Sequence, residues 1–443
     1  DQGKTSNIAG IGILSKKLSK GIKDIGTTTF RMPYTPVTFG AIGGIDIKSL
    51  FDPVRLTKID PWHRKNEARY EHVGQWMRAW YYPRENESIQ ITVNREVYNT
   101  RKNVGVLDAS TLGKIDIKGK DSRKFLNMLY TNDWSSISKG QCKYGLMLKE
   151  DGMVFDDGVT SCINENHFHM STTSGGASNV MSWMEEWLQT EWPHMDVFLT
   201  SVTEQWTVIS LSGPKSKEVL NSAGCDINLS NENFPFMTFK EGSIDKVPVR
   251  IFRISFTGEL SYEINVPSRY GLHLWQQIIK NGEQFNLMPY GTEAMHVLRA
   301  EKGFIIVGQE TDGSVNPLDL GMNWIVSKKK NDFIGKTSLS ITSLNNNRKQ
   351  LVGIHTNDPN KVLPEGAHAV QQVGKPPVKM LGHITSSYFS PNCNRSIALA
   401  LIKNGHSKIG QTVHFPLLND EVVSAKVVKP LFFDPNGDRI NGI

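Results

Sequence analysis

The apolar pattern of the chain changes type at Arg348, and this change constrains the fold more than any other feature. Before it, helical and extended patterns alternate; after it, short alternating strands separated by Gly, Pro and Asn turns dominate. Such strands predict a small β barrel or sandwich over residues 345–443; the clearest runs are 351–355, 379–385, 397–402 and 422–428. A chain of 443 residues is also too long for one ordinary core.

Two α+β segments precede the predicted barrel. In the first, residues 91–204, we expect helices at 93–103, 122–129 and 176–187 and strands at 114–118, 144–148, 153–161 and 167–172. Asp121 is a candidate N-cap for the second of these helices. The second segment, residues 205–289, shows strands at 207–211, 249–255 and 261–266. Residues 290–340, with a helix at 292–300, are expected to complete the first domain, so the fold class is α+β.

The first 90 residues differ from the rest of the chain. A short amphipathic helix is expected over 8–22, followed by Gly, Pro and aromatic residues that resist helix formation. We interpret residues 1–90 as an extended N-terminal arm, the end of a preceding domain and a linker. Its aromatic side chains are expected to anchor it on a neighbouring surface: Trp62, Trp76, Trp80, Tyr81 and Tyr82.

Composition excludes several classes of function. Apolar residues make up 38% of the chain, but no run approaches the ~18 residues of a spanning helix, so we expect no membrane association. Four cysteines without a CxxC pair give no support for a metal site and fit a reducing, cytoplasmic location. A net charge of +6 without a basic helix or repeat gives no sign of nucleic-acid binding. No GxGxxG, Walker or GxSxG motif is present, so no flavin or NAD site is expected here.

Three segments contain candidate site residues. The first is a strand–turn–strand from Tyr144 to Thr160 with the adjacent acids Asp156 and Asp157, which point to opposite faces of the second strand. The second is Phe256-Thr-Gly-Glu-Leu-Ser-Tyr-Glu-Ile264, where Glu259 follows a tight turn. The third places Arg299 near the end of a helix, where arginine also suits the helix dipole. Surface or turn acids are the alternative interpretation of both acidic segments.

Together these segments resemble aminomethyltransferase, the T-protein of the glycine cleavage system. The similarity extends from about Val93 to Arg439 and includes Asn316-Pro-Leu-Asp-Leu-Gly-Met322 and Phe333-Ile-Gly-Lys336. Further motifs are similar to the α subunit of heterotetrameric sarcosine oxidase: Pro33-Tyr-Thr-Pro-Val-Thr-Phe39, Phe51-Asp-Pro-Val-Arg55 and Glu186-Trp-Leu-Gln-Thr-Glu-Trp192. That family's α subunit begins with a dinucleotide-binding region that this sequence lacks, so the resemblance is to its C-terminal portion.

The resemblance implies a three-domain ring around tetrahydrofolate. It also implies that sarcosine is oxidised at a flavin on a β subunit and that the imine or formaldehyde equivalent is captured here as 5,10-methylenetetrahydrofolate, with glycine and hydrogen peroxide as the other products. FAD or FMN and NAD are then expected elsewhere in the complex, and the β subunit and small subunits are the expected partners.

By the same match, each candidate residue has a role. Asp157 is the catalytic acid nearest folate N10, where a carboxylate can orient the nitrogen and manage its proton. Tyr144 contacts folate, Glu259 accepts two hydrogens from the pteridine, and Arg299 holds the glutamate tail. Val307 stands where many T-proteins have tyrosine, so one tail contact is lost or replaced.

Two other functions remain open from the sequence. One is a stand-alone folate-dependent aminomethyltransferase or demethylase, against which the long arm argues; dimethylglycine also remains a candidate amine. The other is a non-enzymatic folate-binding protein of iron–sulfur assembly. That branch has a cysteine in its Lys-Gly-Cys-Tyr motif, whereas Lys302-Gly-Phe-Ile-Ile-Val-Gly-Gln-Glu310 has none.

Overall fold

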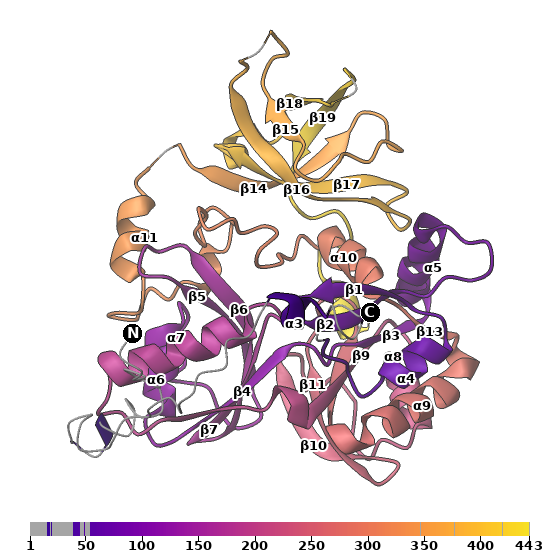
Figure 1. Ribbon diagram of the computed structural model, residues 1–443, viewed down its shortest axis with the longest axis vertical. Coiled ribbons are helices and arrows are strands. Elements are labelled where there is room, and N and C mark those ends of the chain that lie inside the picture. Colours follow the sequence, from indigo (N-terminus) through magenta and orange to yellow (C-terminus); the bar gives the residue numbers. More distant parts are fainter. Residues whose placement is uncertain are drawn as a thin grey trace.

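The fold consists of three lobes arranged as a triangle, with a β barrel at one corner and an α+β lobe at each of the others (Figure 1). The computed structural model describes residues 16–17, 19, 39–44, 48 and 54–442, apart from 346, 376 and 419. The helix predicted over 8–22 therefore lies outside the described residues except at a few positions, and the only helix described before residue 54 with defined bounds is α3 (Phe39–Gly43). No helix in these ranges is long and apolar enough to cross a bilayer.

The first α+β lobe contains a five-stranded antiparallel sheet. Its order is β5-β6-β7-β4-β8, and the strands are β5 (Cys142–Leu148), β6 (Val154–Asn164), β7 (His167–Thr172), β4 (Gly113–Lys118) and β8 (Phe198–Ser201). Helices α6 (Ser122–Leu129) and α7 (Ala177–Thr190) pack their apolar residues on one face, so that Phe125, Phe168 and Val180 share one core. The other face carries polar side chains and looks toward the second lobe.

The predicted cap of α6 is correct in position but wrong in mechanism. Asp121 is the N-cap residue, yet its side chain makes no capping hydrogen bond to the helix. Its carboxylate instead accepts a hydrogen bond from the backbone N–H of Asp196, 2.8 Å away. Asp121 therefore ties the helix start to the segment before β8.

The second lobe contains a six-stranded sheet of order β10-β11-β12-β9-β3-β13. The strands are β10 (Thr238–Ile244), β11 (Val247–Arg253), β12 (Ser261–Pro267), β9 (Trp206–Ser212), β3 (Val104–Asp108) and β13 (Leu287–Pro289). Helices α8 (Ser216–Ser222) and α9 (Gly271–Gly282) cover one face, and their core includes Leu220, Trp275 and Ile264. Strand β3 belongs to the segment predicted as the first domain but pairs with β9, so the chain crosses between lobes within that segment.

Two helices connect the sheets to the barrel. Helix α5 (Ile89–Lys102) leads into β3, and α10 (Thr292–Glu301) follows β13 and packs on α5. Helix α11 (Lys336–Thr342) precedes the third lobe, which is a closed barrel of order β14-β17-β16-β15-β18-β19. Its strands are β14 (Lys349–Thr356), β17 (Arg395–Lys403), β16 (Met380–Ser390), β15 (His368–Val370), β18 (Thr412–Pro416) and β19 (Val422–Val428). The sequence left a barrel and a sandwich as alternatives, and the structure shows a barrel.

The N-terminal arm is not simply extended over residues 54–90, which corrects the prediction for that part of it. Residues 54–90 include helix α4 (Asp60–Lys65) and a hairpin of β1 (Arg69–Val73) and β2 (Trp76–Tyr81). The aromatic anchoring is confirmed for Trp62, whose ring meets Trp275 edge-on at 5.3 Å. A buried His63 adds a polar anchor, because its Nε2 lies 3.0 Å from Asp108 Oδ2. Helix α4 is therefore part of the second lobe's packing.

Candidate functional site

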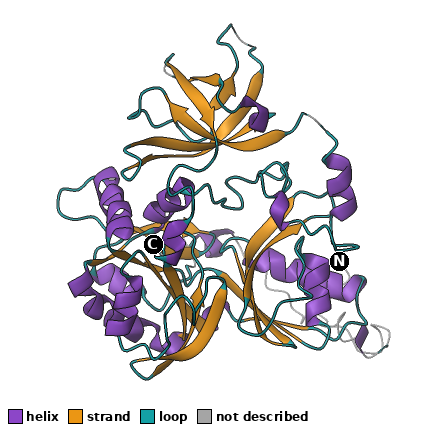
Figure 2. Cartoon of the chain, turned by 180° about the vertical axis from the view of Figure 1, so that it is seen from behind, coloured by secondary structure: helices purple, strands orange, loops and turns teal. Residues whose placement is uncertain are grey.

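The polar faces of the two sheets line a narrow cavity of about 20 Å³. Strands β4, β6 and β7 supply one wall, and β9, β11 and β12 supply the other; Figure 2 shows these two sheets close together, seen from behind. The lining includes hydrophobic residues and a set of polar ones, namely Lys114, Ser161, His169, Ser171, Glu263 and Asn265. Buried polar groups of this kind normally have hydrogen-bond partners, so their concentration around a cavity indicates a binding site.

Asp157 lies on the wall contributed by β6. Side chains alternate along a strand, so Asp157 shares the face of Val159 and Ser161, which both line the cavity. Its Oδ2 accepts a 2.6 Å hydrogen bond from the hydroxyl of Tyr144 on the neighbouring strand β5. Burial raises the pKa of Asp157 to about 6, and the Tyr144 hydrogen bond opposes this rise. The carboxylate is therefore mostly ionised at neutral pH and available as a proton acceptor.

Tyr144 connects Asp157 to the exterior. Burial raises the pKa of its phenol well above 10, so the hydroxyl stays protonated and donates to Asp157. On its other side the ring of Trp324 lies 6.4 Å away and is tilted by 30°. Trp324 is 71% exposed, so aromatic surface leads from the acid toward solvent.

Asp156 points the other way, as strand alternation predicts. It is 1% exposed, and a Cβ added at Gly176 would come within 2.8 Å of its Oδ2, which places it under the start of α7. Burial, and then the neighbouring charge of Asp157, raise the pKa of Asp156 to about 7, while Thr173 opposes the rise. The two adjacent acids thus occupy different environments, and only Asp157 is on the cavity side.

Glu263 is the acidic residue on the opposite wall of the cavity, and it was not among the residues predicted from the sequence. It lines the cavity on β12 together with Asn265, two residues further along the same strand face. Burial raises the pKa of Glu263 to about 7, and the charge of Lys114 opposes the rise. The carboxylate makes no hydrogen bond to any residue within the described ranges. One sequence feature could have identified Glu263, namely that Ser261, Glu263 and Asn265 alternate with the apolar residues Tyr262 and Ile264.

Glu259, predicted to bind the pteridine, lies in a buried ion-pair network. It is 1% exposed, and its Oε1 accepts hydrogen bonds from Arg101 at 2.7 Å and from Arg439 at 2.6 Å. Arg101 also pairs with Glu301 at 2.8 Å. A carboxylate shared between two arginines has little capacity left for a ligand, so Glu259 stabilises the junction of α5, α10 and the C-terminal segment.

Arg299 is likewise held by protein groups. It is 0% exposed, and its guanidinium donates to Glu310 at 2.7 Å, to Ser386 at 2.6 Å and to the backbone oxygen of Phe304 at 3.0 Å. These contacts fix helix α10 to strand β16 of the barrel. The structure therefore brings Tyr144 and Asp157 together but puts Glu259 and Arg299 in separate buried ion-pair networks.

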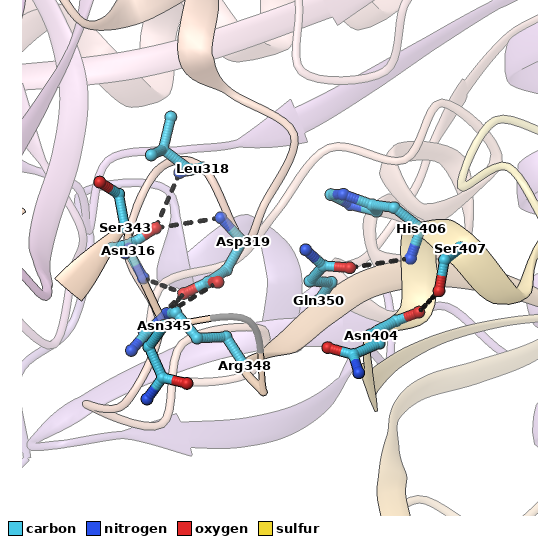
Figure 3. Close-up of a pocket in the computed structure, with 10 residues that line it drawn as sticks. All are labelled: Asn316, Leu318, Asp319, Ser343, Asn345, Arg348, Gln350, Asn404, His406 and Ser407. Carbon is cyan, nitrogen blue, oxygen red and sulfur yellow. Dashed lines mark hydrogen bonds and ion pairs between the residues drawn. The ribbon is translucent and has the colours of Figure 1, made fainter.

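A second, more open pocket lies where the barrel meets the loop before α11, with side chains that are mostly polar (Figure 3). Asp319 and Arg348 form a bidentate pair there, with N–O distances between 2.6 and 2.9 Å. None of its lining residues comes from β5, β6 or β12, so it is separate from the inter-sheet cavity. Within the described ranges, no group of three or more His, Cys, Asp or Glu side chains is arranged to hold a metal.

Comparison with protein families matches both halves of the described chain. Residues 59–330 match the GCVT N-terminal domain, and residues 349–434 match the glycine cleavage T-protein C-terminal barrel domain. Residues 1–45 match the sarcosine oxidase A3 domain.

Individual relatives agree with these matches. The chain is 49% identical over 450 residues to the sarcosine oxidase subunit alpha of Corynebacterium sp. (strain P-1), covering 100% of this chain and 46% of that one. It is 30% identical over 350 residues to the aminomethyltransferase of Thermosipho melanesiensis, covering 79% of this chain and 91% of that one. The chain thus spans about half the length of the sarcosine oxidase relatives it matches.

The fold is similar to that of a solved structure, the glycine cleavage system aminomethyltransferase T from Bartonella henselae. The TM-score is 0.75 at 21% identity, and the superposition covers 86% of this chain and 98% of the other. The predicted fold class, α+β with a C-terminal barrel, is confirmed.

Proposed function

Because the chain belongs to the glycine cleavage T-protein family, we propose that it binds tetrahydrofolate in the inter-sheet cavity and transfers a one-carbon unit to it. One observation carries the proposal. Two carboxylates with raised pKa values lie on facing sheets: Glu263 lines the cavity, and Asp157 shares the strand face of the lining residues Val159 and Ser161. Perturbed acids at a cleft are characteristic of functional sites.

The polar groups that line the cavity match the hydrogen-bonding edge of a reduced pteridine. Its ring offers an N3–H and a 2-amino group side by side, and one carboxylate accepts both hydrogens. With respect to the residues that the structure describes, Glu263 has a carboxylate without a hydrogen bond, and Asn265 has a buried Oδ1 without a hydrogen-bond partner. Such groups are costly when they remain unsatisfied, so a donor-rich ligand would satisfy both. We assign the pteridine to Glu263 in place of Glu259.

Asp157 would act at the reacting end of the folate. Tetrahydrofolate supplies the N5 and N10 nitrogens that accept the carbon. The carboxylate of Asp157 is mostly ionised at neutral pH. One of its oxygens accepts a hydrogen bond from the Tyr144 hydroxyl, and the other would accept the N10 proton. The Tyr144 hydrogen bond also fixes the carboxylate's orientation. Holding both reactants between the two sheets would supply further acceleration by proximity.

The relatives support a larger assembly. The match of the whole chain to about half of the sarcosine oxidase alpha subunits supports a role for this chain as the folate part of such an enzyme. In that role it would receive the imine or formaldehyde equivalent made from sarcosine at a flavin on a β subunit, and it would release 5,10-methylenetetrahydrofolate. Glycine and hydrogen peroxide would be the products of the whole complex, which would include small subunits and carry NAD and flavin outside this chain.

A stand-alone aminomethyltransferase is the second candidate. The match that covers 91% of the Thermosipho aminomethyltransferase supports it, because that relative matches this chain over most of its own length. Co-purification discriminates the two functions: a folate site of sarcosine oxidase would be recovered with a flavin-bearing partner, whereas a stand-alone enzyme would not.

The function is tested by Glu263→Gln, which keeps the shape of the side chain but removes the charge. We expect the affinity of the 443-residue chain for tetrahydrofolate to fall by about 10–100-fold, the range for losing a charge-assisted hydrogen bond of 1.5–3 kcal/mol. Glu241→Gln is the matched control, because Glu241 lies on the nearby strand β10 with a 60% exposed side chain. Isothermal calorimetry measures both. Equal affinities for wild type and Glu263→Gln would exclude the assignment of the pteridine to this acid.

Binding should also release protons near neutral pH. The free Glu263 carboxyl has a pKa of about 7, and only its ionised form accepts two ligand hydrogens. Ligand binding therefore lowers this pKa, so affinity should rise from pH 6 to pH 8 and then level off. Calorimetry in two buffers of different ionisation enthalpy counts the protons released at pH 6.5. Lys114, His169 and Asp157 can also titrate on binding. The number of protons released by Glu263 is therefore the difference between the wild type and Glu263→Gln. Equal proton release in the two proteins would contradict the prediction.

A further inference from the structure

A carboxylate between two imidazoles lies beside the cavity, on two interior strands of the first sheet. Asp116 on β4 lies opposite His169 on β7, with His167 two residues away on the same face. Oδ1 of Asp116 is 2.8 Å from Nδ1 of His169, and its Oδ2 is 3.0 Å from Nε2 of His167. The side chain of His169 is 5% exposed and that of His167 is 18% exposed. Only His169 lines the cavity.

The position of His169 is set from both sheets. Its ring stacks on Phe252 of β11 at a centroid distance of 6.0 Å and meets Trp206 edge-on at 6.3 Å. Asp116 fixes the ring by its Nδ1, so Nε2 is the nitrogen left for a ligand. Nε2 makes no hydrogen bond to any residue in the described ranges. The Oδ1 of Asn265, a residue that is 4% exposed, is a second unpartnered acceptor on the facing wall.

The contact with Asp116 determines the tautomer of His169. The two imidazoles hold the pKa of Asp116 well below its usual range, so this carboxylate is ionised. Burial lowers the pKa of His169, so its imidazole is neutral at pH 7. A neutral imidazole beside an anionic carboxylate carries its hydrogen on the bonded nitrogen. His169 therefore donates from Nδ1 to Asp116 and offers Nε2 as an acceptor.

We propose that His169, held in this tautomer by Asp116, is a positioning residue that selects the reduced pteridine ring. The inference rests on the proposed function, and it adds a basis for specificity. Glu263 takes the N3–H and amino edge, and N5 and N10 must stay free to accept carbon. The ring N8–H, present in tetrahydrofolate and absent from fully oxidised folic acid, is then the donor that Nε2 can accept. In folic acid N8 is itself an acceptor, and two lone pairs facing each other in a buried site are unfavourable.

Asp116→Asn tests the tautomer directly. The asparagine amide would donate to Nδ1 and move the ring hydrogen to Nε2, which would convert the ligand-facing nitrogen from acceptor to donor. We expect the ratio of the Kd of folic acid to that of tetrahydrofolate, measured by calorimetry on the 443-residue chain, to fall by about 10–100-fold. The histidine ¹⁵N shifts should show the exchange of tautomers without ligand. A purely structural role for Asp116 would weaken both ligands alike and leave the ratio unchanged.

Two further variants separate the possible outcomes. His169→Gln can present its Oε1 as an acceptor and should recover part of the selectivity. His167→Gln, on the outer oxygen of the same carboxylate, should leave the ratio at the wild-type value. An unchanged ratio in Asp116→Asn, with the ¹⁵N shifts showing the exchanged tautomer, would overturn the inference even if wild type binds tetrahydrofolate. Failure of wild type to bind tetrahydrofolate would instead overturn the proposed function itself.

Discussion

Asp157→Asn is expected to lower one-carbon transfer to tetrahydrofolate by about 10²–10⁴-fold, the usual range for a lost general acid or base. Asparagine preserves the shape and can still meet the Tyr144 hydroxyl, but it cannot take a proton from N10. Folate affinity should fall much less, because Glu263 remains on the opposite wall. The measurement is methylenetetrahydrofolate formed against free formaldehyde released in the assembled complex.

Asp156→Asn provides the matched control for this prediction. Asp156 lies one residue away and is more buried, but it faces Thr173 and the start of α7 instead of the cavity. With a pKa of about 7 it is already partly neutral at physiological pH, so the amide should be tolerated and transfer should be nearly unchanged. Peroxide production should continue in both variants, because oxidation would occur on another subunit. Equal losses of one-carbon transfer in Asp157→Asn and Asp156→Asn would mean that neither acid has a specific role in the transfer.

Arg299→Met should destabilise the chain by about 3–5 kcal/mol, the range for breaking a buried ion pair by removing one partner. The cause is Glu310, which is 0% exposed and would be left charged without its arginine. Ser386 and Thr385 also donate to Glu310 and would not replace the lost positive charge. Denaturant unfolding monitored by circular dichroism measures the loss.

A double variant distinguishes this structural role from binding of the folate tail. Arg299→Met with Glu310→Leu removes both charges, and apolar replacements of similar volume are often neutral or stabilising. We expect the double variant to recover most of the lost stability and to bind tetrahydrofolate with wild-type affinity. A stable double variant that binds the ligand ten or more times more weakly would restore the tail-binding role that the sequence suggested for Arg299.

Much of the fold could be predicted because its signals are local. The change to short strands after Arg348 identified the barrel, and period-two alternation separated the faces of Asp156 and Asp157. The proximity of Asp157 and Tyr144 follows from the same local rules, because β5 and β6 are adjacent antiparallel strands that are close in sequence.

The contacts that argue against Glu259 and Arg299 as ligand residues join distant segments. Glu259 and Glu263 lie four residues apart, and the turn before Glu259 made it the more prominent candidate. Its partners, Arg101 and Arg439, are 158 and 180 residues away. Nothing local to the turn indicates that these arginines converge there. Arg299 was assigned to a ligand for the same reason, because its partner on the barrel strand β16 is 87 residues away.

The central claim is that tetrahydrofolate binds between the two sheets, and a crystal structure with a stable reduced folate, 5-formyltetrahydrofolate, tests it most directly. We predict electron density for the pteridine between β6 and β12, with its amino edge against Glu263 and the remainder of the molecule passing Asp157 and Tyr144. Density confined to the polar pocket beside Arg348, or no density at saturating ligand in an open crystal lattice, would contradict the account.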